Sequence, residues 1–229
     1  GKSYVRGTYV VTMNEGNDWE EGQHYLQLSN REKELLELVC SKFDNVTVIV
    51  NTNNAMELGW LDDYEQIGSA IWAPCPGQSG FSALGKIMSG EVNPSGRTVD
   101  TFLRDLTQTP IVNNFGDFVY DNMEEHAYVS TDWITQEKMT TIPTFVNYVE
   151  GIYVGYRYYE TAYAEAQAGN MDFDYDEAVV YPFGYGLSYT TFSQTMTEPQ
   201  ADGDGNITFD VTVTNTGEVA GKDVVEVYV

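Results

Sequence analysis

Glu15 is the residue of this sequence whose type and position are best suited to chemistry. It lies in residues 14–18 (NEGND), which follow a short β-branched and apolar run at residues 8–13 (TYVVTM). The run predicts a strand, and the polar segment predicts a loop. Because open α/β sheets bind ligands just beyond the carboxyl ends of their strands, this carboxylate is a candidate functional group. A glutamate that is simply solvated in a loop is the alternative interpretation.

Other residue types that bind metals or form disulfides show no useful spacing. His24 and His126 are isolated in the sequence, and Cys40 and Cys75 lie in unrelated apolar contexts. We therefore expect ordinary histidines and two buried free thiols rather than a metal site or a disulfide framework. Residues 202–206 (DGDGN) resemble a calcium loop, but the sixth-position glycine and twelfth-position glutamate of an EF-hand are missing, so they predict a hairpin turn.

The first part of the chain alternates helix and strand patterns, which predicts a partial α/β/α sandwich with a mainly parallel sheet. Ser29 is positioned to cap a helix in which apolar residues recur at helical spacing as far as about Phe43. The continuous apolar runs are typical of parallel strands that are covered on both faces. Expected strands are residues 8–13, 46–50 and 69–73, and expected helices are residues 29–43, 55–64 and 77–88.

The second part of the chain changes character after the turn at residues 93–96 (NPSG). Residues 110–145 show no sustained period and predict a long connection. The tail alternates apolar and polar residues, which predicts antiparallel strands that begin an immunoglobulin or fibronectin-III-like β-sandwich. The apolar positions of these expected strands are Ile207, Phe209, Val211 and Val213, and then Val225, Val227 and Val229.

The charge of the chain excludes some partners. Its 35 acidic and 11 basic residues give a formal net charge of −24 at pH 7. Contact with nucleic acid is electrostatically unfavourable at this charge, so no nucleic-acid partner is expected. No apolar run approaches the roughly 20 residues that cross a bilayer, so we expect no membrane span in this chain. The sequence assigns no cellular compartment.

Several stretches, in the expected order, are similar to the C-terminal half of family 3 glycoside hydrolases, which include β-glucosidases and β-xylosidases. The loop at 14–18 resembles the family's Gly-Glu-Gly-x-Asp, although Trp19, directly after it, stands where arginine is common. In a second stretch, residues 76–80 (PGQSG), Ser79 stands where glutamate is common. The other matching stretches are residues 93–97 (NPSGR), 148–159 (YVEGIYVGYRYY) and 181–190 (YPFGYGLSYT), and residues 213–217 (VTNTG) with 220–222 (AGK) resemble the opening of a fibronectin-III-like domain.

The resemblance implies a retaining β-glycosidase, most often a β-glucosidase, that acts on a β-linked oligosaccharide or glycoside without a metal or organic cofactor. Such enzymes need two carboxylates about 5–5.5 Å apart, a nucleophile and a general acid/base. The resemblance assigns the acid/base role to Glu15. It also places Asp18 and Trp19 near the substrate, where Asp18 can alternatively hold the loop by accepting backbone hydrogen bonds and Trp19 can simply pack.

The nucleophile of such an enzyme belongs to a barrel domain, which this chain lacks. Residues 131–133 (TDW) resemble the nucleophile motif, but they lie in the irregular region, so we do not assign the nucleophile to Asp132. We expect a piece of a larger protein that is inactive alone, with the missing barrel domain as its partner. A non-catalytic carbohydrate-binding or scaffold module is the alternative. The expected domains are the second half of the α/β sandwich at residues 1–145, an aromatic linker at 146–190 and the start of the fibronectin-III-like sandwich at 191–229.

Overall fold

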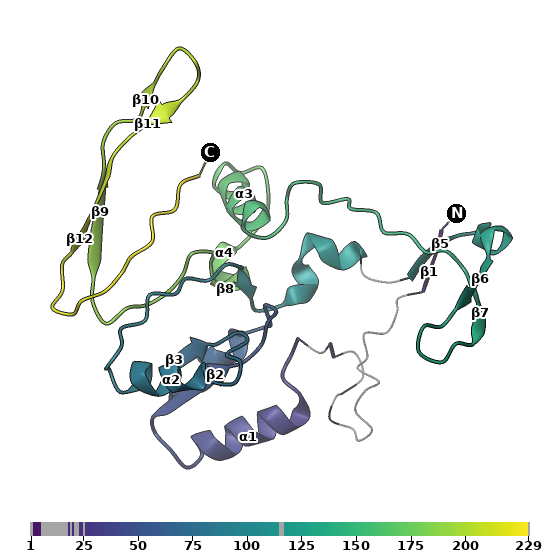
Figure 1. The fold of residues 1–229 in the computed structure, drawn as a ribbon, viewed down its shortest axis with the longest axis horizontal. Helices are drawn as coiled ribbons and strands as arrows, with labels where there is room; N and C mark the ends of the chain where they lie inside the picture. Colours follow the sequence, from purple (N-terminus) through teal and green to yellow (C-terminus); the bar gives the residue numbers. More distant parts are fainter. Residues whose placement is uncertain are drawn as a thin grey trace. The chain divides into compact units, whose positions relative to one another are not determined.

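The computed structural model describes residues 2–5, 18, 20, 23–24, 26–114 and 117–228 (Figure 1). The strand expected at residues 8–13 lies outside the described residues. Contacts divide the chain into two compact units that alternate along the sequence. One contains residues 1–48, 56–69 and 103–180, and the other contains residues 49–55, 70–102 and 181–229. The domain boundaries expected at residues 145 and 190 remain predictions.

The helix α1 (Asn30–Cys40) begins where the sequence predicts. The Ser29 hydroxyl accepts a hydrogen bond from the Glu32 backbone N–H at 3.4 Å, and the Glu32 carboxylate accepts one from the Ser29 N–H at 2.8 Å. This reciprocal capping box satisfies two backbone donors that would otherwise have no helical partner. The helix ends before Phe43, and Cys40 is the residue of α1 that is buried.

Strands β2 (Val46–Val50) and β3 (Ile67–Trp72) form a two-stranded sheet. Both predicted strands are therefore present. β2 has the predicted bounds, and β3 starts two residues and ends one residue before the predicted range of 69–73. Backbone hydrogen bonds flank the pair, from Val46 N–H to the Gln66 carbonyl at 2.8 Å and from Ala73 N–H to the Val50 carbonyl at 2.9 Å. Every described sheet has two strands, so the larger, mainly parallel sheet remains a prediction.

Two of the expected helices are shorter than the sequence suggests. The segment at 55–64 forms only the 3₁₀ helix η1 (Gly59–Asp63), and α2 (Phe81–Met88) begins four residues later than expected. A turn precedes α2, in which Gly80 N–H donates to the Pro76 carbonyl at 2.8 Å and Gly77 has a φ of +61°. Glycine adopts that left-handed conformation without the steric cost of a Cβ, so residues 77–80 form a turn in place of helix.

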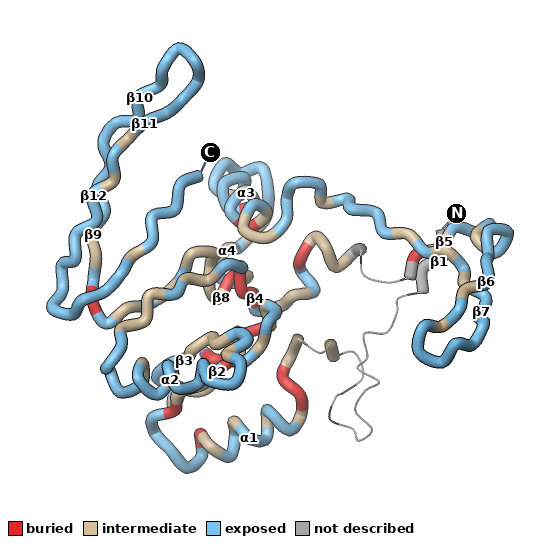
Figure 2. The backbone as a smooth tube through the Cα atoms, in the orientation of Figure 1, coloured by how far each residue is buried: buried red, intermediate tan, exposed pale blue. Residues whose placement is uncertain are grey.

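A small core surrounds β4 (Phe102–Leu103) and β8 (Val179–Tyr181), which pair with each other. Leu103, Tyr159 and Val179 are buried together. Tyr159 belongs to α3 (Tyr156–Gln167), a helix that the sequence analysis did not predict, and α4 (Tyr175–Ala178) covers the same cluster. Figure 2 shows buried residues at the start of α1, in β2 and around β4 and β8, whereas the hairpins are exposed.

The long connection predicted at residues 110–145 has short elements of regular structure. It contains the 3₁₀ helices η3 (Pro110–Asn114) and η4 (Met123–His126), which follow η2 (Leu106–Gln108). Strand β5 (Asp117–Tyr120) pairs antiparallel with β1 (Lys2–Val5), and β6 (Tyr128–Thr131) forms a hairpin with β7 (Lys138–Thr141). Each element has at most five residues, too few to show a hydrophobic period.

The tail contains two antiparallel pairs, β9 (Phe192–Met196) with β12 (Val211–Asn215) and β10 (Gln200–Ala201) with β11 (Ile207–Thr208). Residues 202–206 form the predicted hairpin turn, with Asp202 N–H donating to the Asn206 carbonyl at 3.0 Å. The strand expected around Val225 is wrong, because residues 221–228 form no strand. The segment contacts β9 through a side chain, because Gln194 Nε2 donates to the Val224 carbonyl at 3.0 Å. A β-sandwich remains a prediction.

Candidate functional site

Of the loop at residues 14–18, which carries Glu15, the structure describes the last residue, Asp18. Glu15 and Trp19 lie outside the described residues, and Asp18 lies within them. The Asp18 carbonyl accepts a hydrogen bond from Asn30 N–H at 2.7 Å, and its carboxylate Oδ1 accepts one from Arg31 N–H at 3.0 Å. Asp18 is therefore fixed to the first turn of α1, where a carboxylate also interacts favourably with the helix dipole.

A second polar connection follows Asp18 along the chain. His24 Nε2 lies 3.0 Å from Glu57 Oε1, and the same carboxylate oxygen accepts a hydrogen bond from Leu106 N–H at 2.9 Å. Glu57 is only 8% exposed, so these donors replace the water that it loses on folding. No local pattern predicts this pair, because His24 and Glu57 are 33 residues apart. The isolated histidine of the sequence is thus a structural hydrogen-bond partner.

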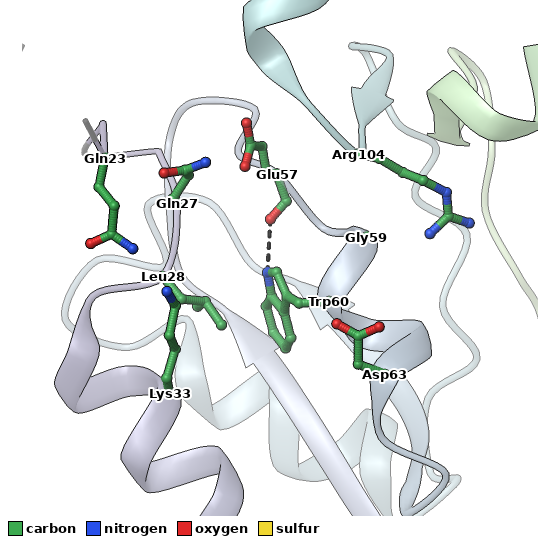
Figure 3. Close-up of a pocket in the computed structure, with 9 residues that line it drawn as sticks. All are labelled: Gln23, Gln27, Leu28, Lys33, Glu57, Gly59, Trp60, Asp63 and Arg104. Atoms are coloured by element: carbon green, nitrogen blue, oxygen red, sulfur yellow. Dashed lines mark hydrogen bonds between the residues drawn. The ribbon is translucent and has the colours of Figure 1, made fainter. Parts of the chain in front are cut away.

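A pocket of about 410 Å³ opens beside this pair (Figure 3). Gln23, Gln27 and Leu28 from the segment before α1, together with Lys33 of α1, line one side. Residues in and just before η1, namely Glu57, Gly59, Trp60 and Asp63, complete the lining together with Arg104, which follows β4. The volume is within the range of small-molecule sites, and the lining combines an aromatic ring with amides and charged groups.

The Trp60 ring is held in place in this pocket. Its indole N–H donates a hydrogen bond to the Glu57 carbonyl at 2.8 Å (Figure 3). Arg104 forms an ion pair with Asp62 at 2.7 Å, so its charge is partly neutralised. The hydrogen bond to Glu57 therefore preorganises the aromatic surface. Within the described residues, the unpaired polar groups of the lining are the amide Nε2 groups of the two glutamines, the Lys33 ammonium and the Asp63 carboxylate.

Asp132 lies at the turn of the β6–β7 hairpin. Its carboxylate Oδ1 accepts hydrogen bonds from Thr135 N–H at 2.7 Å and Ile134 N–H at 2.8 Å. These backbone hydrogen bonds lower the pKa of Asp132 by stabilising its ionised form. The carboxylate closes a turn, which is an ordinary role for aspartate.

The remaining candidates of the sequence are dispersed in the structure. Both cysteines are free, and Cys40 is buried as predicted. The prediction of a buried thiol is wrong for Cys75, which lies in the loop after β3 and is exposed. Its thiol donates a hydrogen bond to Asn53 Oδ1 at 2.7 Å. Across the described ranges, no group of three or more His, Cys, Asp or Glu is arranged to hold a metal ion. No helix in the described part of the chain has the length and apolar character to cross a membrane.

Comparison with known proteins identifies the family. Residues 5–156 match the model of the glycosyl hydrolase family 3 C-terminal domain, a range that includes Glu15. This chain belongs to glycosyl hydrolase family 3. It is 33% identical to beta-glucosidase A of Butyrivibrio fibrisolvens over 94% of its own length, and 34% identical to beta-glucosidase B of Emericella nidulans over 96%. The chain spans 24% and 23% of the lengths of these two relatives.

Solved structures show the same relationship. A beta-glucosidase from Paenibacillus barengoltzii covers 88% of this chain with a TM-score of 0.63 and 29% identity. The beta-glucosidase from Kluyveromyces marxianus in complex with glucose covers 84% with a TM-score of 0.60 and 27% identity. This chain corresponds to 19% and 18% of those two chains. The structural relatives support an α/β domain of this family.

Proposed function

We propose that this chain is part of a retaining β-glycosidase, most simply a β-glucosidase, and that Glu15 is its general acid/base. The observation that carries the proposal is the family match over residues 5–156, which spans the Asn-Glu-Gly-Asn-Asp segment, together with the two relatives described as beta-glucosidases. The substrate would be a terminal β-linked sugar of an oligosaccharide or glycoside. The nucleophile would come from a barrel domain outside this chain, and this chain alone would be inactive.

The anchoring of Asp18 supports this role for the loop. Asp18 is held to the start of α1 by two hydrogen bonds, and Glu15 precedes it by three residues. An extended chain spans at most about 3.6 Å per residue, so the tether between the two is no longer than about 11 Å. A short tether to a fixed point limits the conformations of a catalytic loop and reduces the entropy lost when substrate binds. In this proposal Asp18 and Trp19 border the substrate.

The proposed reaction needs no metal or organic cofactor. Glu15 would protonate the oxygen of the leaving group while the nucleophile attacks the anomeric carbon and forms a covalent glycosyl-enzyme. Glu15 would then remove a proton from the water that hydrolyses the intermediate. The same group serves as acid and then as base, and the anomeric configuration is retained.

Removal of the Glu15 carboxylate in the full-length protein tests this role. General acid/base assistance contributes about 10²–10⁴-fold, so Glu15→Ala should lower the rate by that order for glycosides with poor leaving groups. Formation of the glycosyl-enzyme from activated aryl glycosides should suffer far less, because those leaving groups need little protonation. Azide should restore turnover by attacking the intermediate without a general base.

Glu20→Ala provides the matched control, because Glu20 is an exposed carboxylate near the same loop and its described contacts are made by its backbone. It should leave both activities and the azide response unchanged. Equal losses on both classes of substrate after Glu15→Ala, without azide rescue, would show that Glu15 shapes the loop and does not transfer the proton. A full-length protein with no glycosidase activity would favour a non-catalytic carbohydrate-binding or scaffold module.

A further inference from the structure

We propose that the pocket between α1 and η1 binds one pyranose ring of a β-linked oligosaccharide, separate from the sugar whose bond is cleaved. That the ligand is a sugar rests on the proposed function. That the pocket is a binding site rests on its volume of about 410 Å³, its oriented tryptophan and its unpaired polar groups.

The two glutamines present hydrogen-bond donors. Gln23 Oε1 accepts a hydrogen bond from Glu20 N–H at 2.8 Å, and Gln27 Oε1 accepts one from His24 N–H at 3.4 Å. These bonds fix which end of each amide faces the backbone. Within the described part of the chain, the Nε2 groups have no side-chain partner, so each keeps donors for a ligand.

The rest of the lining adds a cation, an acceptor and an aromatic surface. Figure 3 shows the Trp60 ring between Lys33 and Asp63. Neither charged group forms an ion pair with another described residue. A pyranose matches this combination, because its hydroxyl groups both donate and accept hydrogen bonds and its C–H face is apolar enough to lie on an indole ring.

Other ligand classes fit this lining less well. An apolar ligand would remove water from the amides, Lys33 and Asp63 without replacing its hydrogen bonds, which is costly. A polyanion would meet Asp63 and Glu57 in a chain whose net charge is −24. A neutral polyhydroxylated ring avoids both costs.

The pocket is not suited to be the catalytic centre itself. Glu57 Oε1 is occupied by His24 and by Leu106 N–H, so this oxygen already has two hydrogen-bond partners within the protein. The proposal therefore gives the pocket a binding role, for a second sugar ring of the substrate, and leaves the acid/base role to Glu15. Its occupation would favour longer oligosaccharides over simple aryl glycosides.

Selectivity for chain length in the full-length enzyme tests the proposal. The variants are Gln27→Ala and Asp63→Ala, which remove polar groups, and Trp60→Ala, which removes the aromatic surface. The probes are 4-nitrophenyl β-glucoside and β-linked gluco-oligosaccharides of two to four units. Each variant should lower the ratio of kcat/KM for the best oligosaccharide to that for the aryl glucoside by about tenfold, equivalent to about 1.4 kcal/mol.

Trp133→Ala is the matched control, because Trp133 is a tryptophan that is 83% exposed on the β6–β7 hairpin and does not line the pocket. It should leave the selectivity ratio unchanged. If Trp60→Ala does not fold, Gln27→Ala and Asp63→Ala decide the result, since Asp63 is exposed and the Gln27 side chain makes one long hydrogen bond of 3.4 Å to His24 N–H. An unchanged ratio in those two variants would overturn the proposal.

Direct binding separates this proposal from the proposed function. Saturation-transfer NMR with cellotetraose should show contact with the wild-type protein and weaker contact with the Gln27→Ala and Asp63→Ala variants. The Trp133→Ala control should show the same contact as the wild-type protein. That result in a protein without glycosidase activity would support the sugar site and refute the catalytic proposal. Active enzyme whose oligosaccharide binding is unaffected by the pocket variants would refute the sugar site alone.

Discussion

The Asp223 carboxylate accepts a hydrogen bond from the Arg97 guanidinium at 2.6 Å, across 126 residues of sequence. Arg97 also donates to the Gly186 carbonyl, and Gln194 Nε2 donates to the other Asp223 oxygen at 2.8 Å. The two charged side chains are 20% and 10% exposed. The ion pair therefore connects the turn at residues 93–97, the loop at 181–190 and the segment after β12.

Loss of the Asp223 charge should destabilise the protein at neutral pH. Asp223→Asn removes the charge from a nearly buried pair, and we expect the free energy of unfolding to fall by about 1–3 kcal/mol. Hydrogen bonds from Gln194 and Arg97 lower the pKa of Asp223 in the folded state. A lowered folded pKa stabilises the protein above the unfolded value of about 3.9, and this contribution is lost as pH falls through the folded pKa.

Denaturant titrations at several pH values check this prediction. The difference in stability between wild type and Asp223→Asn should be constant above about pH 5 and should shrink below about pH 4. Gln194→Ala, which removes one donor and keeps the charge, should give a smaller loss with the same sign. A difference that does not change between pH 7 and pH 3 would contradict the assignment of the effect to this carboxylate.

The capping box of α1 supplies a second prediction. Ser29 is 6% exposed and its hydroxyl accepts the Glu32 N–H, so Ser29→Ala leaves that donor without its partner. We expect a loss of about 0.5–2 kcal/mol in unfolding free energy, while Ser29→Thr should retain most of the stability. Hydrogen exchange of the first-turn amides measures the effect locally, and unchanged protection of these amides in Ser29→Ala would be inconsistent with a capping role.

Asp132 should be dispensable for catalysis. Asp132→Asn keeps an oxygen that can accept from Ile134 and Thr135, so the hairpin turn should persist and the rate of the full-length enzyme should stay within a few-fold of wild type. Trapping of the covalent glycosyl-enzyme, followed by mass spectrometry, is the measurement. Failure of Asp132→Asn to form the intermediate would identify Asp132 as the nucleophile after all.

Local patterns allowed prediction of those elements whose cause is local. The α1 helix follows from the Ser29 and Glu32 spacing, and β2 follows from a continuous apolar run. The sequence pattern predicts that α2 starts at Gly77, but the helix starts at Phe81. The positive φ of Gly77 places this residue in a turn, which a helical pattern does not reveal. Helix α3 was missed because its aromatic residues matched a family linker, although Tyr159 and Ala162 are buried at helical spacing.

Relationships that depend on distant residues could not be predicted. The hydrogen bond of His24 to Glu57 and the position of Trp60 beside Lys33 need the folded chain to bring separate segments together. The assignment of the acid/base role to Glu15 came from motif similarity, and without it a solvated loop glutamate is the default interpretation. Long-range polar contacts leave no periodic signal, so the pocket has no counterpart in the sequence analysis.

The His24 and Glu57 pair yields a final prediction about the structure around the pocket. Glu57→Ala removes an acceptor that serves both His24 and Leu106 N–H in a site that is 8% exposed, and we expect a loss of about 1–3 kcal/mol in unfolding free energy. Glu57→Gln keeps one acceptor oxygen and should lose less. His24→Ala should cost less than Glu57→Ala, because Leu106 N–H then keeps its partner. A double-mutant cycle of His24→Ala and Glu57→Ala measures the coupling, and strictly additive losses would mean that the 3.0 Å contact contributes nothing to stability.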